Sequence, residues 1–176
     1  IAYRLKNDKL VERSLETQMS RRLGGEFKLI VYSNKVSGAE HVALVKGDIS
    51  TPAPVLVRMH AVNILDDVLH DEISGRGAEI ESSLRIIGEA GSGVLVLIRD
   101  TWGQSFSNQV RQRHEVSIDA GLASSEIAVG GQDAGSFLSP ALRDYGVGAQ
   151  TLRDLGITEM ILLTNHTRAI KGLDGY

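Results

Sequence analysis

The sequence predicts a mixed α+β fold, a single domain in which helices flank one mixed sheet. The first half of the chain consists mostly of short β-like runs separated by turns, whereas strands and helices alternate in the second half. One segment, residues 54–93, joins the two patterns, because an apolar run leads through a polar loop into an amphipathic helix. With 176 residues, the chain is long enough to bury a core of ordinary size.

The composition is typical of a soluble globular protein, with 42% hydrophobic and 23% charged residues. A net charge of -3 provides no basic surface for nucleic acid or for an acidic membrane, so neither is expected as a partner. No apolar run approaches the roughly 18 residues of a membrane span, and no signal peptide opens the chain. We therefore expect a cytoplasmic protein. The absence of cysteine excludes disulfides, thiolate nucleophiles and thiolate metal sites.

Residues 1–22 are highly charged and predict a helical linker from a preceding domain, followed by an entering strand. The domain itself is expected to comprise residues 23–176. The apolar positions of this linker are Leu5, Leu10, Val11 and Leu15. A solvated helix without a partner is the alternative interpretation. Because the chain begins at Ile1 and ends after a glycine-rich tail, we expect a piece of a longer polypeptide, truncated at its C-terminal end.

Three strands are predicted in the first half, because short apolar runs are separated by turns that contain Ser-Asn-Lys, Gly-Asp and proline. These runs are Phe27–Tyr32, Val42–Lys46 and Val55–Met59. A helix over Ala78–Ala90 follows, and Gly91 provides its C-terminal stop. The continuous apolar run Val94–Ile98 then predicts a strand that is buried on both faces.

The second half is less regular. Residues 104–121 are polar and predict helix only in part, and residues 123–135 predict a loop rich in glycine and serine. Gly146 and Gly148 would each cost about 1 kcal/mol inside a helix, so the next helix is predicted from Val147 to Gly156. A last strand is predicted over Met160–Thr164.

Several phrases resemble a known family. Residues 54–93 contain Arg58 and His60 before a polar loop and a helix, residues 41–50 read H-V-A-L-V-K-G-D-I-S, and residues 142–157 read L-R-D-Y-G-V-G-A-Q-T-L-R-D-L-G-I. Their order and spacing resemble GTP cyclohydrolase II, the zinc enzyme that opens the guanine ring of GTP in riboflavin synthesis. The resemblance covers about residues 23–176 and implies the fold of that family.

The resemblance places the three zinc-binding cysteines of the family at Asn63, Ser74 and Arg76. A neutral amide, an un-ionised hydroxyl and a permanent cation are unsuited to zinc, so no zinc is expected and no cofactor is predicted. Magnesium would enter only with a bound nucleotide.

A substitute metal site is the alternative to this loss of zinc. An acidic cluster follows Asn63, comprising Asp66, Asp67, His70, Asp71 and Glu72. Asp67, His70 and Asp71 would share a face if this segment were helical. The competing interpretation is a solvated acidic loop whose charge is balanced by Arg76.

Some substrate-binding positions of the family are retained. The resemblance assigns Arg58, His60, Glu79 and Thr164 as candidates for binding a nucleotide or its phosphates, although Glu79 replaces a glutamine of the family. Arg143 corresponds to the catalytic arginine of the family. The alternative is that Arg58, Arg143 and Thr164 make buried hydrogen bonds that hold the strand ends.

Other positions of the family are replaced. The proposed general base corresponds to Ala141, which cannot accept a proton, and a substrate-binding lysine corresponds to Ala169. Val62 replaces a glutamate, and Asp100–Gly103 replaces the substrate-contacting signature Q-E-G-R. Within that stretch, Trp102 is interpreted as a plug or packing residue in preference to a stacking platform.

The combined losses predict a catalytically degenerate GTP cyclohydrolase II-like domain. The junction at residues 1–22 resembles that of fused proteins in which a 3,4-dihydroxy-2-butanone 4-phosphate synthase precedes this domain. We therefore expect a structural or regulatory role toward such a synthase, in a parent protein that is a riboflavin-pathway lyase, and a homodimer as the family implies. The alternatives are a sensor of phosphate, nucleotide or flavin, and an active GTP cyclohydrolase II that uses a substitute metal.

Overall fold

The computed structural model describes residues 10–99, 105–114 and 140–164. Six strands form one sheet: β1 (Val11–Arg21), β2 (Gly25–Asn34), β3 (Glu40–Lys46), β4 (Val55–Val62), β5 (Gly93–Arg99) and β6 (Met160–Leu162). The helices are α2 (Ile64–Asp67), α3 (Glu79–Ala90), α4 (Phe106–His114) and α5 (Pro140–Asp154). No helix in the described ranges is long and apolar enough to cross a membrane.

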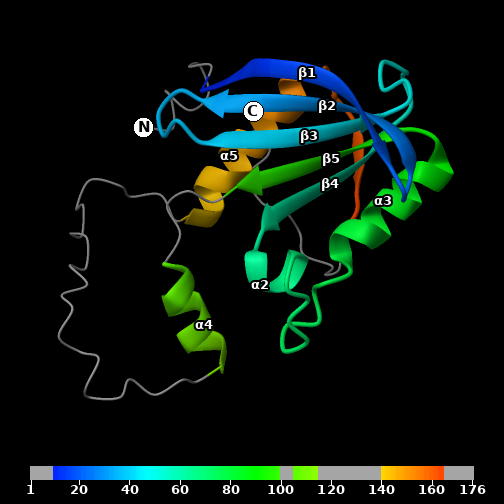
Figure 1. Cartoon of the computed structure of the whole chain (residues 1–176). Coiled ribbons are helices and arrows are strands. Elements are labelled where there is room, and N and C mark those ends of the chain that lie inside the picture. The colour runs from blue at the N-terminus through cyan, green and yellow to red at the C-terminus, as the bar shows by residue number, and fades with distance from the viewer. Residues whose placement is uncertain (1–9, 100–104, 115–139, 165–176) are drawn as a thin grey trace, which may run out of the picture.

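The sheet is mixed, with the strand order β1-β2-β3-β5-β4-β6 (Figure 1). The strands β1, β2, β3 and β5 pair antiparallel in succession, and β4 pairs parallel with both β5 and β6. This arrangement confirms the predicted mixed sheet with flanking helices.

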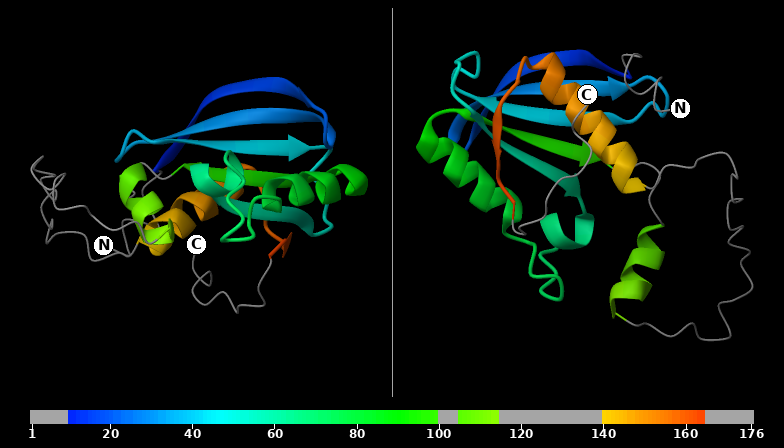
Figure 2. Two further views of the ribbon diagram at one scale, coloured as in Figure 1. Left: turned by 60° about the horizontal axis from the view of Figure 1, so that its bottom comes forward. Right: turned by 180° about the vertical axis from the view of Figure 1, so that it is seen from behind.

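The core has two layers because residues alternate between the two faces of each central strand. On one face, Leu84 and Ile87 of α3 pack with Leu95 of β5. On the other face, α5 covers the residues that alternate with them, as the view from behind shows (Figure 2). In β5 five of seven residues are buried, so the expectation of a strand covered on both sides is confirmed.

The prediction of a helix within residues 1–22 is wrong for residues 11–21, and residues 1–9 lie outside the described residues. Residues 11–21 form the edge strand β1, which pairs with β2 along its whole length, with a bulge between Arg13 and Leu15. Two contacts with α5 hold this strand: the Leu10 amide donates to Gln150 Oε1 at 2.8 Å, and Arg13 Nε lies 2.5 Å from Asp154 Oδ2. Tertiary pairing therefore overrides a charge pattern that suggests an exposed helix.

The helix α5 also differs from the prediction, because it begins at Pro140 and includes both glycines. A Cβ added to Gly148 would lie 1.8 Å from Met59 Cε, so the helix backbone approaches β4 where a side chain would displace Met59. Close packing on the sheet thus compensates for the low helix propensity of glycine at this position.

The remaining predicted elements agree in place. The helix α3 ends at Gly91, which has the left-handed conformation (φ 77°) of a helix C-terminus. Helix α4 occupies part of the polar stretch 104–121, whereas the loop predicted for residues 123–135 lies outside the described residues. The strand β4 extends to Val62, beyond the predicted end at Met59, so His60 belongs to the strand together with Arg58.

Candidate functional site

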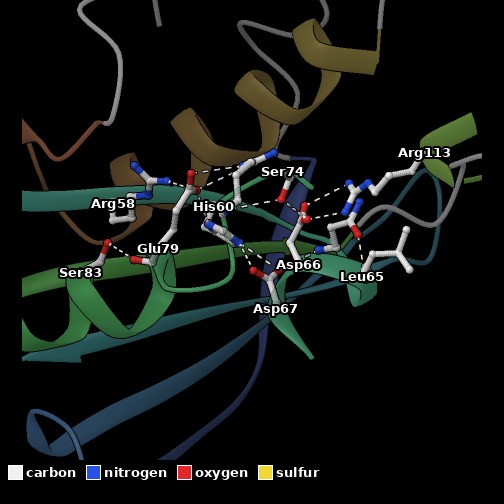
Figure 3. A network of polar contacts seen from close by, with 11 residues as sticks. Arg58, His60, Leu65, Asp66, Asp67, Ser74, Glu79, Ser83 and Arg113 are labelled. Atoms are coloured by element: carbon white, nitrogen blue, oxygen red, sulfur yellow. Dashed lines mark hydrogen bonds and ion pairs between the residues drawn. The ribbon is translucent and has the colours of Figure 1, made fainter. Parts of the chain in front are cut away.

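The retained residues gather where the carboxyl end of β4 meets the first turn of α3 (Figure 3). Arg58 and His60 are two residues apart on β4, so their side chains share the face that α3 covers. Glu79, the first residue of α3, contacts both of them. Open α/β sheets commonly bind ligands at the carboxyl ends of their strands.

A carboxylate lies between two arginines at this place. Arg58 Nη2 is 2.6 Å from Glu79 Oε2, and Arg76 Nε is 3.2 Å from Glu79 Oε1. Arg58 Nη1 also donates to the carbonyl oxygen of Leu163 at 3.0 Å, which links β4 to the chain just after β6. Burial alone would raise the pKa of Glu79, but the hydrogen bond and charge of Arg76, with the charge of Arg58, hold it below its ordinary value.

His60 lies between two carboxylates and is 1% exposed. Its Nε2 is 2.9 Å and 3.0 Å from the two carboxylate oxygens of Asp67, and its Nδ1 is 3.6 Å from Glu79 Oε2, beyond hydrogen-bond distance. In the part of the chain that the structure describes, neither His60 Nδ1 nor the buried Nε of Arg58 has a hydrogen-bond partner.

The residues at the zinc positions of the family make hydrogen bonds or ion pairs with other residues of the chain. Asn63 caps α2, because its Oδ1 accepts a hydrogen bond from the Leu65 amide at 2.9 Å. The hydroxyl of Ser74 donates to Asp66 Oδ1 at 2.5 Å. Arg76 is a cation paired with Glu79. These residues do not fit a zinc ion, which binds thiolate, imidazole or carboxylate donors.

The structure does not bring Asp67, His70 and Asp71 together in the way that the substitute metal site would require. The helix α2 ends at Asp67, and His70 has a positive φ of 52°, so Asp67, His70 and Asp71 do not share a helical face. Asp71 pairs with Arg113 Nη1 at 3.4 Å and with His114 Nε2 at 3.1 Å. Within the described ranges, no group of three or more His, Cys, Asp or Glu side chains is placed to hold a metal ion.

The acidic segment is also not a solvated loop balanced by Arg76 alone. Asp66 is 1% exposed and pairs with both terminal nitrogens of Arg113 from α4. Burial would raise the pKa of Asp66, but hydrogen bonds from Arg113 and Ser74, with the charges of Arg113 and Arg76, keep it below its ordinary value. Sequence reasoning missed Arg113, since 47 residues separate it from Asp66 and no local pattern connects them.

The other candidates are only partly placed. Thr164 is exposed and follows Leu163, whose carbonyl accepts from Arg58, so the chain brings Thr164 beside the site. Arg143 lies in the first turns of α5, but its side chain is outside the described part, as is that of Ala141. Asp100–Gly103 and Ala169 lie outside the described residues.

Comparison with known proteins finds both a family and individual relatives that this chain resembles. The family model described as GTP cyclohydrolase II matches residues 12–176. The chain is 39% identical over 180 residues to riboflavin biosynthesis protein RibBA of Bacillus cereus (strain B4264), covering 100% of this chain and 43% of that protein. It is 35% identical over 179 residues to RibBA of Chlorobium phaeovibrioides, covering 100% of this chain and 41% of the relative. The chain thus spans less than half the length of these relatives.

A solved structure shares the fold. It is RibBX, a two-domain 3,4-dihydroxy-2-butanone 4-phosphate synthase from A. baumannii, with a TM-score of 0.57 and 24% sequence identity. The match covers 99% of this chain and 40% of that chain. The resemblance found in the motifs is confirmed by the family match over nearly the whole length: this chain belongs to the GTP cyclohydrolase II family.

Proposed function

We propose that this chain is a catalytically degenerate GTP cyclohydrolase II domain with a structural or regulatory role toward a 3,4-dihydroxy-2-butanone 4-phosphate synthase. One observation carries the proposal. The three positions that the family resemblance assigns to zinc hold an N-cap amide, a hydroxyl that donates to Asp66, and a guanidinium paired with Glu79. None of them is an available metal donor.

The losses are chemical and not only geometric. Zinc in such an enzyme would supply an activated water for attack on the guanine ring, and no side chain of the described site replaces that function. Arg58 and His60 are buried and bound to carboxylates, so they hold the site together but provide no nucleophile. The alanine at position 141 cannot replace a general base.

The loss of cyclohydrolase activity can be tested by formate release from GTP, with magnesium and added zinc and with a functional GTP cyclohydrolase II as the positive control. We expect no formate above the blank. Turnover would contradict the proposal, and its loss on adding a chelator would point to a metal site other than the three family positions.

The proposed partner follows from the relatives. The match covers 40% of a two-domain synthase and 43% of a RibBA protein, which leaves room for a second domain in each. Synthase activity of the full-length protein should be compared with that of a version from which this GTP cyclohydrolase II domain has been deleted. We expect the version without this domain to have a lower synthase rate, a lower melting temperature or an altered assembly state. Equality in all three would refute the proposed role.

A sensor of nucleotides, flavins or other phosphates is the second candidate, and one observation favours it. Arg58 Nε and His60 Nδ1 are buried and without hydrogen-bond partners among the described residues, which is where a ligand could add contacts. A ligand that binds only the folded chain raises its melting temperature. GTP with magnesium, flavin mononucleotide and pyrophosphate should each be tested, and a flat response across them would remove this candidate.

A further inference from the structure

The segment between β4 and α3, residues 63–78, has little regular structure of its own. Its only helix is the four-residue α2. Four of its large apolar side chains are more than half exposed, namely Ile64, Val68, Leu69 and Ile73. Because such a segment buries little apolar surface, other interactions must fix its path.

A buried carboxylate lies at the centre of this segment. Asp66 is 1% exposed and accepts hydrogen bonds from two directions. Ser74 donates to it from the far end of the same loop at 2.5 Å. Arg113 donates to both of its oxygens from α4, and the same guanidinium is 3.4 Å from Asp71 Oδ2. One arginine thereby joins two points of the loop to a helix distant in sequence.

Two further residues of the loop, Asp67 and Arg76, attach it to the sheet and to α3. Asp67 accepts from the Asn63 amide at 2.7 Å and contacts His60 of β4. At the other end, Arg76 bridges to Glu79, which in turn pairs with Arg58 of β4. Each end of the loop therefore has a polar link to β4, the strand from which the loop departs.

We propose that this network, centred on Asp66, Ser74, Asp71 and Arg113 and here called the ionic clamp, fixes the loop in the place where the family resemblance puts zinc. In the family, a metal ion bound at the positions of Asn63, Ser74 and Arg76 would connect the start and the end of the loop. The clamp connects Asp66, near the start of the loop, with Ser74, near its end, through a hydrogen bond, and connects both to α4 through Arg113. This inference concerns the folding of the chain and does not depend on a role toward a synthase.

The clamp can be tested by replacing Arg113 with methionine, which keeps the length of the side chain and removes its charge. Backbone hydrogen exchange should be measured at Asp67, Leu69 and Asp71, whose amides bond to carbonyls inside the loop. Leaving Asp66 buried without its arginine partner should accelerate their exchange by about ten-fold or more, while amides of β5 keep their protection.

Arg85→Met is the matched control, because Arg85 is an exposed arginine on α3 outside the ionic clamp. It should leave exchange in the loop unchanged. Ser74→Ala is a milder second variant, should Arg113→Met fail to fold, and should accelerate exchange at the same amides. If the clamp variant that folds behaves like Arg85→Met, the inference is wrong.

A gain-of-function variant tests whether the clamp and the family zinc site occupy the same place. The triple substitution Asn63→Cys, Ser74→Cys and Arg76→Cys should bind one zinc ion per folded chain. Zinc should restore slow exchange in the loop even when Arg113→Met is added. A folded triple variant that binds no zinc, or that zinc does not protect, would overturn the shared location.

Discussion

Two polar clusters connect helices to the sheet, and they differ in how completely their hydrogen bonds are made. At the junction of β1 and β2 with α5, the hydroxyl of Tyr32 on β2 donates to Asp154 Oδ2 at 3.0 Å, and Arg13 on β1 contacts the same carboxylate and the Asp154 carbonyl. At the β4–α3 site, Arg58 Nε and His60 Nδ1 are buried but unpaired within the described residues.

The difference favours a structural role for the first cluster and the proposed ligand site for the second. A polar group that serves only the fold is normally fully hydrogen-bonded when it is buried, since an unmade bond destabilises the folded state. The junction follows this rule at Tyr32 and Asp154. The site departs from it at Arg58 and His60, two residues apart on one strand, and the family resemblance assigns both positions to substrate binding. This unused capacity for hydrogen bonds supports the proposal of a ligand site at β4.

The largest effect is expected at the site, for Glu79→Ala. Removing this carboxylate, whose side chain is 11% exposed, leaves Arg58 buried without its counter-ion, and the free energy of unfolding should fall by about 3 kcal/mol. Urea unfolding measures it. Glu81→Ala is the control, because Glu81 is exposed in the same first turn of α3, and its effect should stay within about 0.5 kcal/mol.

The double variant Arg58→Met with Glu79→Leu sharpens the comparison. A buried ion pair replaced by apolar side chains is often neutral for stability, so the double variant should be more stable than Glu79→Ala alone. Recovery of the stability of the unsubstituted chain would mean that the charges of the site are dispensable for folding. If the double variant is the less stable of the two, the site is as structural as the junction, and the distinction drawn between the clusters fails.

The two regions were not equally predictable from the sequence. The apolar runs at β3 and β5 and the periodicity of α3 report burial directly, because each central strand is covered on both faces. The strand β1 carries no such signal, since ten of its eleven residues are not buried. Its position depends on β2 and on contacts with Gln150 and Asp154, about 140 residues away.

The site was predictable in part for the same reason. Arg58, His60 and Glu79 could be named from a motif because they lie within one contiguous segment. The contacts among these three residues could not be predicted, because the sequence does not show that the first turn of α3 lies against β4. The pairing of Asp66 with Arg113 could not be predicted for the same reason as the position of β1. A contact between segments that are distant in sequence produces no periodicity in either segment.

A smaller effect is expected at the junction, for Tyr32→Phe. This change removes one buried hydroxyl but leaves Asp154 paired with Arg13, so the free energy of unfolding should fall by about 1 kcal/mol. Ser14→Ala removes an exposed hydroxyl from the neighbouring strand, where it bonds to the Val31 carbonyl, and should have an effect below about 0.5 kcal/mol. Equal losses would indicate that burial does not strengthen the junction.

The smallest effect concerns His41, the third buried side chain with an unpaired nitrogen in the described part of the chain. Burial, with a smaller contribution from the charge of Arg99, lowers its pKa from 6.5, so the folded chain favours the neutral ring. Below that pH the unfolded chain binds more protons than the folded one, and stability must fall as the pH decreases. His41→Asn keeps an acceptor for the Arg99 amide but cannot titrate. Thermal melts from pH 7.5 to 5.5 should therefore decline less steeply for the variant, since the other histidines act equally in both proteins. Parallel curves would mean that His41 takes up its proton in the folded chain as readily as in the unfolded one, and that its unpaired nitrogen is accessible to water, unlike those of Arg58 and His60.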